Sequence, residues 1–538
     1  MLEGINHLAK IMQSKGIFKS FKIIDAQRKA VKEKVSSLDL NFYLYHSSLD
    51  IWQGAVYFLI EKEKEKKLIS FIPRKDNDDG FVADKILNLD GFRVRICSLT
   101  HENALIMREI FSYIAPTVLG TEPAFGTGDR IGGKVSATPG HIRALKDYNV
   151  AAFFAQQSVR ENARTKRTFQ EVLDDATWGV FQEGYKARWG ADADHLMDLA
   201  SMGLAVDAGF TMFTIDPSNY INNAAPNMEK EKLKREWTKL FSTRKDAKNF
   251  LEKYLFLRKE VISGTHRLRI EYSQEKIMRI AVQYLRAVRF TIDAYAAIAQ
   301  HKGSNNFDFE MSVDETSIPT TPLAHYLIAR ELNNAKVRLT SLAPRFDAGF
   351  EKGVDIRTND GKKPSFNELR KFEDSVRNHA LIARKMGPYK LSIHSGSDKF
   401  TAYPIISKYT KGMFHLKTAG TSYLEAVKVI VRHDPSLFKR MHQCALDTFE
   451  ENRHAYYLTT NLTNIPQVEE LNQREIVEGL TENDDWRQVI HVAYGVLLDK
   501  FKKRMVDVLR ENREDYYETL AKHIRKHLET FGLKKFRN

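Results

Sequence analysis

The 538-residue sequence predicts an α/β protein whose larger part is a (β/α)8 barrel of the TIM type, joined to a small N-terminal α+β domain. Two observations lead to this prediction. From about residue 115, short apolar strands alternate with longer helical stretches, which is typical of a parallel sheet. Eight strand–helix units follow one another, and this number favours a closed barrel over an open sheet.

Composition sets the broad class. Hydrophobic residues make up 43% and charged residues 28%, as in ordinary soluble globular proteins. The chain has neither an apolar run of roughly 18 residues, as a membrane span requires, nor an N-terminal apolar core typical of a secretory signal. Cys97 and Cys444 lie in unrelated contexts and predict neither a disulfide framework nor a thiolate zinc site. A reducing, cytoplasmic setting is expected.

The net charge of +14 would suit nucleic acid, an anionic membrane or an acidic substrate. The surplus is spread through helix-like segments such as 230–245 and 522–537, where acids are interleaved, so a solvated helical surface is favoured. No RNA-binding signature or zinc-finger spacing is present. A basic nucleic-acid-binding protein stays a minor alternative.

Residues 1–114 are interpreted as the small α+β domain, expected to pack against or cover the larger one. Its predicted elements are four strands and one helix: Asn41–Tyr45, Ala55–Ile60, Leu68–Pro73, Phe92–Ile96 and the helix His101–Ile114. The charged run 61–67 predicts a hairpin tip. No catalytic constellation is visible in this part.

Residues 115–538 are interpreted as the catalytic barrel. The predicted strands are Thr117–Gly120, Val150–Gln156, Phe210–Ile215, Phe307–Val313, Arg338–Leu342, Lys390–His394, Met413–Lys417 and Ala455–Thr459. The stretch 217–305 is far longer than a crossover helix needs and predicts a helical insertion at the barrel mouth. Residues 469–529 predict C-terminal helices that pack onto the barrel wall.

The rest of the chain is interpreted as organised around the predicted strand Phe307–Val313 and the residues that follow it. Its apolar residues alternate with Asp308, Glu310 and Ser312, and Asp314 follows directly. Carboxylates on one strand face repel each other unless a cation or protons neutralise them. This stretch is therefore interpreted as half of a metal-and-carboxylate site.

Other predicted strand ends add polar residues, and these ends meet at one face of a barrel. His394 and His415 supply imidazoles, and imidazole with carboxylate but without cysteine suits a divalent ion such as Mn, Ni, Co, Zn or Fe. Arg130, Arg160, Lys399 and Lys417 would favour an anionic substrate, although pairing with nearby acids is as good an explanation for any one of them.

Two further motifs are weaker. Gly126–Gly132 resembles a dinucleotide fingerprint but has the wrong spacing, so no nicotinamide cofactor is expected. Asp192–His195 could ligate a metal, but it is interpreted as a helix cap or loop cluster in a helical region. No nucleophile elbow is present, which disfavours a serine hydrolase.

Several motifs at these strand ends are similar to those of the tagaturonate epimerase family, some members of which act as tagatose 4-epimerases. The motifs are GDRIG (128–132), ATPGHIRA (137–144), QQSVREN (156–162), EVLDDATWGVFQEG (171–184), GADADHL (190–196), FTIDPS (213–218), the stretch 301–326, LAPRF (342–346), HSGSDKF (394–400) and HLKTAGTSYLEA (415–426). The resemblance spans about residues 115–460. The N-terminal domain matches only in outline, and the insertion and basic tail are peculiar to this chain.

The resemblance implies a metal-dependent isomerase that interconverts D-fructuronate and D-tagaturonate, or fructose and tagatose at C4. The inverted carbon is β to the ketone, so deprotonation beside the carbonyl cannot invert it; retro-aldol cleavage, rotation and re-addition would, with the metal stabilising the enediolate. A small ketose or hexuronate is then the expected partner, and the sequence leaves a homo-oligomer open.

Under this hypothesis the metal ligands are Glu310, Asp314, His394 and His415. Glu161 and Asp216 are candidate bases, and Lys417, Lys399 and Arg160 would hold the substrate carboxylate. The remaining predicted substrate-binding residues are Asp129, Arg130, Gln157, Ser158 and Asp398. A metal-dependent aldolase or ketose isomerase on the same barrel is the alternative within enzymes.

Overall fold

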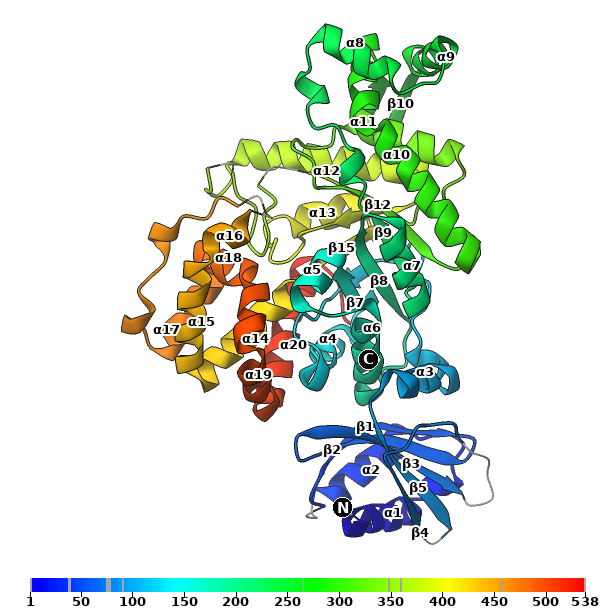
Figure 1. Cartoon of the computed structure of the whole chain (residues 1–538), viewed down its shortest axis with the longest axis vertical. Helices are drawn as coiled ribbons and strands as arrows, with labels where there is room; N and C mark the ends of the chain where they lie inside the picture. Colours follow the sequence, from blue (N-terminus) through cyan, green and yellow to red (C-terminus); the bar gives the residue numbers. More distant parts are fainter. Residues whose placement is uncertain are drawn as a thin grey trace.

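The computed structural model describes residues 2–36, 40–73, 79–89, 91–264, 266–346, 349–358, 360–454, 456 and 458–536. Figure 1 shows an N-terminal α+β unit at one end, a barrel in the middle, a segment rich in helices at the opposite end and a group of C-terminal helices at one side. None of the helices in these described ranges has the length and apolar character that crossing a membrane would need.

The N-terminal unit is a five-stranded antiparallel sheet with strand order β1-β2-β3-β5-β4. Its elements are α1 (Leu2–Ser14), α2 (Asp25–Val35), β1 (Tyr43–Trp52), β2 (Ala55–Lys62), β3 (Glu65–Pro73), β4 (Lys85–Leu89) and β5 (Phe92–Ser98). The turn at Glu63 and Lys64 is the predicted hairpin tip, whereas β4 was not predicted. Because strand side chains alternate between faces, Phe58 packs toward α1 and α2, and Leu59 packs toward the barrel helices.

A closed barrel of eight parallel strands, in the order β12-β13-β14-β15-β6-β7-β8-β9, confirms the predicted fold class. The strands are β6 (Ala124–Gly126), β7 (Ala151–Ser158), β8 (Trp189–Leu196), β9 (Met212–Ile215), β12 (Asp308–Val313), β13 (Ser341–Pro344), β14 (Lys390–Ile393) and β15 (Phe414–Lys417).

Two predicted strands were wrong. Residues 117–120 precede the first strand, which is β6, and Leu458 and Thr459 have no strand structure, while Ala455 and Tyr457 lie outside the described residues. Strand β8 was not predicted as a strand. It contains the Asp192–His195 cluster, which was predicted to lie in a helical region. Ala191 and Ala193 pack into the hydrophobic core, so Asp192 and Asp194 take the opposite face.

Helices connect the strands and surround the barrel (Figure 1). They are α3 (His101–Ile110), α4 (Thr138–Leu145), α5 (Val159–Thr165), α6 (Phe169–Glu183), α7 (Leu199–Ala208), α10 (Gln274–Lys302), α11 (Pro322–Asn334), α12 (Phe366–Met386), α13 (Tyr403–Thr410) and α14 (Thr421–His433).

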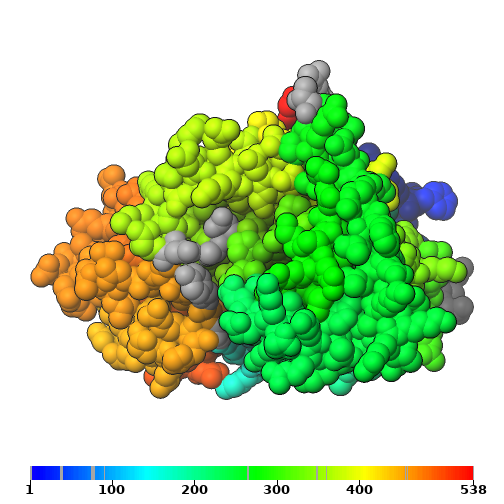
Figure 2. Space-filling model, turned by 90° about the horizontal axis from the view of Figure 1, so that it is seen from above, coloured from blue at the N-terminus to red at the C-terminus, as the bar shows by residue number. Residues whose placement is uncertain are grey.

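The long segment between β9 and β12 is only partly helical. It holds α8 (Lys230–Thr238), α9 (Arg244–Leu255) and the hairpin β10 (Arg258–Ser263) with β11 (His266–Glu271), before α10 leads back to the barrel. Trp237, Tyr254 and Tyr272 form a core of its own, which continues onto Leu327 of α11 and Leu381 of α12. Seen from above, this green segment forms one side of the molecule and the orange C-terminal helices form the opposite side (Figure 2).

The C-terminal region is helical, as predicted. It comprises α15 (Pro435–Asp447), α16 (Phe449–Arg453), α17 (Gln473–Glu482), α18 (Asp484–Val492), α19 (Tyr494–Glu511) and α20 (Arg513–Thr530). Trp486 and Val489 of α18 are buried in one core with Leu424 and Val427 of α14. This packing fixes α18 beside the loops that follow β13 and β15.

Candidate functional site

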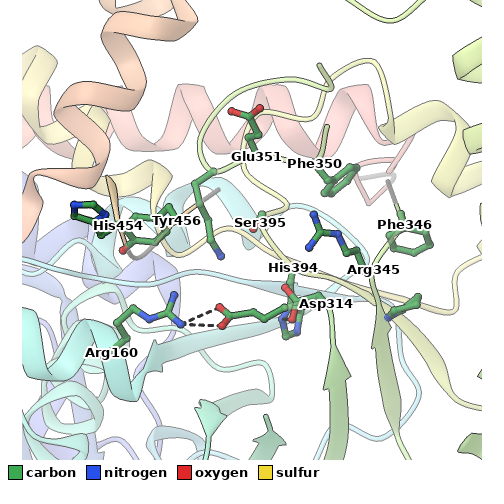
Figure 3. Close-up of a pocket in the computed structure, with 13 residues that line it drawn as sticks. Arg160, Asp314, Arg345, Phe346, Phe350, Glu351, His394, Ser395, His454 and Tyr456 are labelled. Atoms are coloured by element: carbon green, nitrogen blue, oxygen red, sulfur yellow. Dashed lines mark hydrogen bonds and ion pairs between the residues drawn. The ribbon is translucent and has the colours of Figure 1, made fainter. Parts of the chain in front are cut away.

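A cavity of about 420 Å³ lies at the C-terminal ends of the barrel strands. Asp314 and His394 stand where β12 and β14 end, and Phe350, Glu351, His454 and Tyr456 surround the space beyond them (Figure 3). A narrower cavity of about 80 Å³ continues inward and is lined by Glu161, Asp194, His195 and Lys417 among others. Polar side chains at this end of a barrel are typical of an active site.

Two imidazoles face each other at the junction of these cavities. His195 Nε2 lies 3.1 Å from His394 Nδ1. The far nitrogen of each ring is held by a buried carboxylate: His195 Nδ1 is 3.0 Å from Asp216 Oδ2, and His394 Nε2 is 2.6 Å from Glu310 Oε1. A carboxylate behind the imidazole is the usual way in which proteins orient a metal-ligating histidine.

Strand β8 supplies one of these rings through a local distortion. The pairing of β8 with β9 shifts register between Ala193 and Leu196, and His195 has a left-handed backbone (φ +51°). On a regular strand, His195 would face away from Asp194. The bulge turns both side chains toward the inner cavity, and re-aiming of a side chain beside an active site is a common use of bulges.

Carboxylates complete this cluster. A ligand atom of Asp194 lies within 4.8 Å of those of His195 and His394, and Asp314 Oδ1 lies 3.4 Å from His394 Nδ1. Burial opposes protonation of His195, but Asp194 and Asp216 outweigh it and raise the pKa of His195 to about 10. The cluster therefore favours a positive charge at this point, and a divalent cation bound between the rings would supply one.

Lys417 forms the floor below the cluster. Its Nζ lies 2.9 Å from Asp192, Asp194 and Glu310, and it donates to Thr214. Burial alone would raise the pKa of Glu310, but Lys417 first and His394 second hold it well below its usual range. Since three acids already surround Lys417, we place it as a structural counter-charge.

The four sequence-predicted metal ligands fall into two groups. Asp314 and His394 line the cavity, whereas Glu310 and His415 are fully buried below it. His415 Nδ1 is 3.9 Å from Glu310, and its ring stacks on Phe153 with centroids 4.7 Å apart. Burial, together with Lys417 and Lys390, holds the pKa of His415 well below its usual range, so the ring is neutral.

The predicted bases also occupy different positions. Glu161 lines the inner cavity, where its carboxylate accepts from Arg130 Nε at 2.8 Å and from the Ser158 backbone N–H at 3.1 Å. Arg130 in turn stacks on Tyr494 at 4.0 Å. Asp216 is buried behind His195 and accepts from Ser218 N–H, so the structure places it as support for that ring.

Three predicted substrate-binding residues line the cavities: Arg130, Ser158 and Arg160. Arg160 forms a two-pronged ion pair with Glu315 at 2.9 and 3.0 Å, drawn as dashed lines in Figure 3. Ser158 caps α5 and accepts from Glu161 N–H. Arg130 and Arg160 are therefore charge-compensated within the protein.

The other four predicted substrate-binding residues are committed elsewhere. Asp129 accepts three backbone N–H groups of the turn before α4, and Gln157 donates to Thr165. Asp398 is paired with Arg487 and with His523 of α20, each at 2.9 Å. Lys399 donates to backbone carbonyls. A residue in the same motif as a cavity-lining residue can thus hydrogen-bond a loop and not face the cavity.

Sequence reasoning missed Asp194 and His195 as site residues. The signal was present in Gly190-Ala-Asp-Ala-Asp194, where small residues alternate with acids at the period of a strand. Alternation that lacks large apolar residues resembles a loop, because alanine contributes little to hydrophobic periodicity. The bulge that turns His195 inward has no sequence signal of its own.

The fold and the site together define the class of protein: an enzyme of the (β/α)8 barrel type, with its reactive groups at the C-terminal strand ends. The sequence profile of the tagaturonate epimerase family matches residues 45–531. A tagaturonate/fructuronate epimerase of Thermotoga maritima is 41% identical over 479 residues, which cover 89% of this chain and 94% of that protein.

Solved structures of the same family are also similar to this chain. The native and glycerol-complexed crystal structures of a fructuronate-tagaturonate epimerase from Cohnella laeviribosi superpose with a TM-score of 0.83 at 35% identity, and each alignment covers 95% of this chain and 100% of that chain. The chain belongs to the tagaturonate epimerase family and is a carbohydrate epimerase, an isomerase. The match includes most of the N-terminal unit, the segment 217–305 and the C-terminal helices, so it extends beyond the range of the sequence motifs. The expectation that the insertion is peculiar to this chain was therefore wrong.

Proposed function

We propose that this enzyme interconverts D-fructuronate and D-tagaturonate with the help of a divalent metal ion. The similarity to a tagaturonate/fructuronate epimerase over 94% of that protein's length carries the substrate assignment. Cavities lined by cations, carboxylates and serines also suit a hydroxylated sugar acid.

The residues that would hold the metal are His195, His394, Asp194 and Asp314. Two imidazole nitrogens 3.1 Å apart, each ring fixed from behind by a carboxylate, form a donor set for Mn, Ni, Co, Zn or Fe. This set keeps Asp314 and His394 from the sequence-based hypothesis. Asp194 and His195 replace Glu310 and His415, which are fully buried below the cavity. A bound divalent ion would act as a Lewis acid toward negative charge on substrate oxygens.

The chain's own groups then account for the proton movements. In the proposed retro-aldol route, a base takes the proton of the C4 hydroxyl, the C3–C4 bond breaks, and its electron pair moves onto the ketone half as an enediolate. The C4 aldehyde turns, C3 adds to its opposite face, and the proton returns. Glu161 is the proposed base because it lines the inner cavity, whereas Asp216 lies behind His195.

Incubation of the metal-loaded enzyme with D-fructuronate tests the substrate assignment. We expect D-tagaturonate to appear until equilibrium, without accumulation of three-carbon fragments. Fragments that build up in place of tagaturonate would show that the enzyme is an aldolase, since aldol cleavage is the shared first step of both reactions.

Elemental analysis of histidine variants tests the metal set. His195→Ala and His394→Ala are expected to lose most of the bound ion, while His415→Ala retains it. Circular dichroism verifies that all three variants fold. Loss of the ion in His415→Ala with retention in His195→Ala would restore the sequence-based set.

A further inference from the structure

Lys352 stands at the boundary between the two cavities. It lies on the loop after β13 and lines both the outer cavity and the inner one, as do Arg160 and His394. Its side chain is partly exposed, in contrast to the fully buried Lys399. Any ligand that extends from the outer cavity to the histidine pair would pass this ammonium group.

The charge of Lys352 is uncommitted. Arg160 is paired with Glu315, Arg130 with Glu161, and Lys417 with three acids, while Arg345 donates to the Thr316 carbonyl. By contrast, Lys352 Nζ makes no hydrogen bond or ion pair with a residue in the described part of the chain. Among the described lysines and arginines that line the two cavities, Lys352 alone has no hydrogen-bond or ion-pair partner for its side chain, and its charge acts on Asp314 through space.

The loop that carries Lys352 is held rigidly. Lys399 Nζ donates to the Glu351 carbonyl at 2.6 Å and also to the Val354 carbonyl. Arg487 of α18 donates to the Gly353 carbonyl at 3.1 Å, and Gln488 donates to the Glu351 carboxylate at 2.9 Å. The buried cations Lys399 and Arg487 thus hydrogen-bond the backbone on both sides of Lys352. Such contacts hold a binding residue in place before its ligand arrives.

We propose that Lys352 binds the carboxylate of the sugar acid and sets the preference for hexuronates over neutral ketoses. This inference rests on the proposed substrate. In the retro-aldol route the carboxylate stays on the three-carbon aldehyde half, so Lys352 retains that half by its acid end while the carbonyl end turns. The role differs from that of Lys399, whose donors hold the loop.

Kinetics of Lys352→Met, Lys352→Arg and the control Lys371→Met test this role; Lys371 is an exposed lysine of α12. A charge-assisted hydrogen bond is worth about 10- to 100-fold in affinity. We expect Lys352→Met to raise the KM for D-fructuronate by about that factor, Lys352→Arg to recover most of the loss, and Lys371→Met to match the wild type.

A neutral probe separates binding of the carboxylate from general damage. The inhibition constant of D-fructose against D-fructuronate should change less than about twofold in Lys352→Met. The inference would be overturned if Lys352→Met weakened the binding of D-fructose as much as that of D-fructuronate, or if its KM for D-fructuronate were unchanged.

If the wild type failed to convert fructuronate, the proposed function would be wrong. Calorimetric titration with D-gluconate and D-glucitol would then decide the inference: Lys352→Met must lose the preference for the acid.

Discussion

Glu161 occupies the third position of α5, where it closes a capping box with Ser158. Both of its oxygens are held, one by Arg130 and the other by the Ser158 backbone. A carboxylate fixed in this way needs little reorganisation to accept a proton at a defined point, and Arg130 is itself fixed by stacking on Tyr494. A helix cap and the position of the proposed base therefore coincide in one residue.

Replacement of Glu161 by Gln keeps the shape of the side chain and removes the proposed base. We expect kcat for fructuronate to fall by about 100- to 10,000-fold, with bound metal and KM nearly unchanged. Steady-state kinetics and elemental analysis measure these quantities. A variant with kcat within threefold of the wild type would exclude Glu161 as the base.

Asp216 gives a second prediction, because it hydrogen-bonds His195 and lines neither of the two cavities. Asp216→Asn keeps a hydrogen-bonding partner for Nδ1 but removes the charge that orients and polarises the ring. We expect metal affinity to fall by about 10- to 100-fold, and activity to return when metal is added in excess. Activity that stays low at saturating metal would show that Asp216 has a direct chemical role.

Among the elements, α4 and α20 make a contact that depends on a missing side chain. A Cβ on Gly140 of α4 would lie 2.9 Å from Leu520 Cβ of α20 and 3.1 Å from the Tyr517 carbonyl. Helix α20 also presents His523 and His527 to the loop after β14, where Asp398 N–H donates to His527 Nε2 at 3.0 Å. Helix α20 thus packs against helix α4 of the barrel wall and contacts a loop that borders the site.

Gly140→Ala is expected to lower stability by about 1 to 3 kcal/mol, since α20 must shift to admit the methyl group. Gly203→Ala in α7 is the matched control, because a Cβ there meets nothing within 4 Å. That change should raise stability by about 0.5 to 1 kcal/mol through helix propensity. Chemical denaturation of both variants decides the point, and equal effects would contradict the packing argument.

The whole molecule buries several histidines that have no part in the site. His325 of α11 and His379 of α12 are fully buried, and their Nδ1 atoms lie 2.8 Å apart. Burial lowers the pKa of His379 to about 4 and holds that of His325 well below its usual range. The folded protein therefore excludes protons that the unfolded chain binds at its ordinary pKa of about 6.5.

Stability should consequently fall as the pH falls from about 6.5 toward 4, because the unfolded state binds more protons over that range. At pH 5 the loss is about 2 kcal/mol for His379 alone. Denaturation at pH 7 and pH 5 measures it, with His379→Gln losing less than the wild type and the exposed His7→Gln on α1 showing the wild-type loss. A pH-independent midpoint would refute the prediction.

The sequence alone determined the class of fold and the end of the barrel at which the candidate site lies. Strand–helix alternation predicts a parallel barrel, because a helix between two strands lets them run in the same direction. Each strand is then buried on both faces, as β7 and β12 are, and each helix along one stripe. The acidic strand Asp308–Val313 and His394 revealed the polar end. The motifs also indicated the family.

Only the tertiary structure decided which of these residues meet. Asp194 and His195 belong to a strand whose alanines give too weak an apolar signal, and a bulge invisible in the sequence aims His195 at His394. Lys399 and Asp398 lie in the same motif as His394 but are used by loop carbonyls and by α20. Lys352, by contrast, lies outside every motif. A motif indicates which part of the chain lies near the site. The direction in which each side chain points depends on backbone geometry and on neighbours distant in sequence.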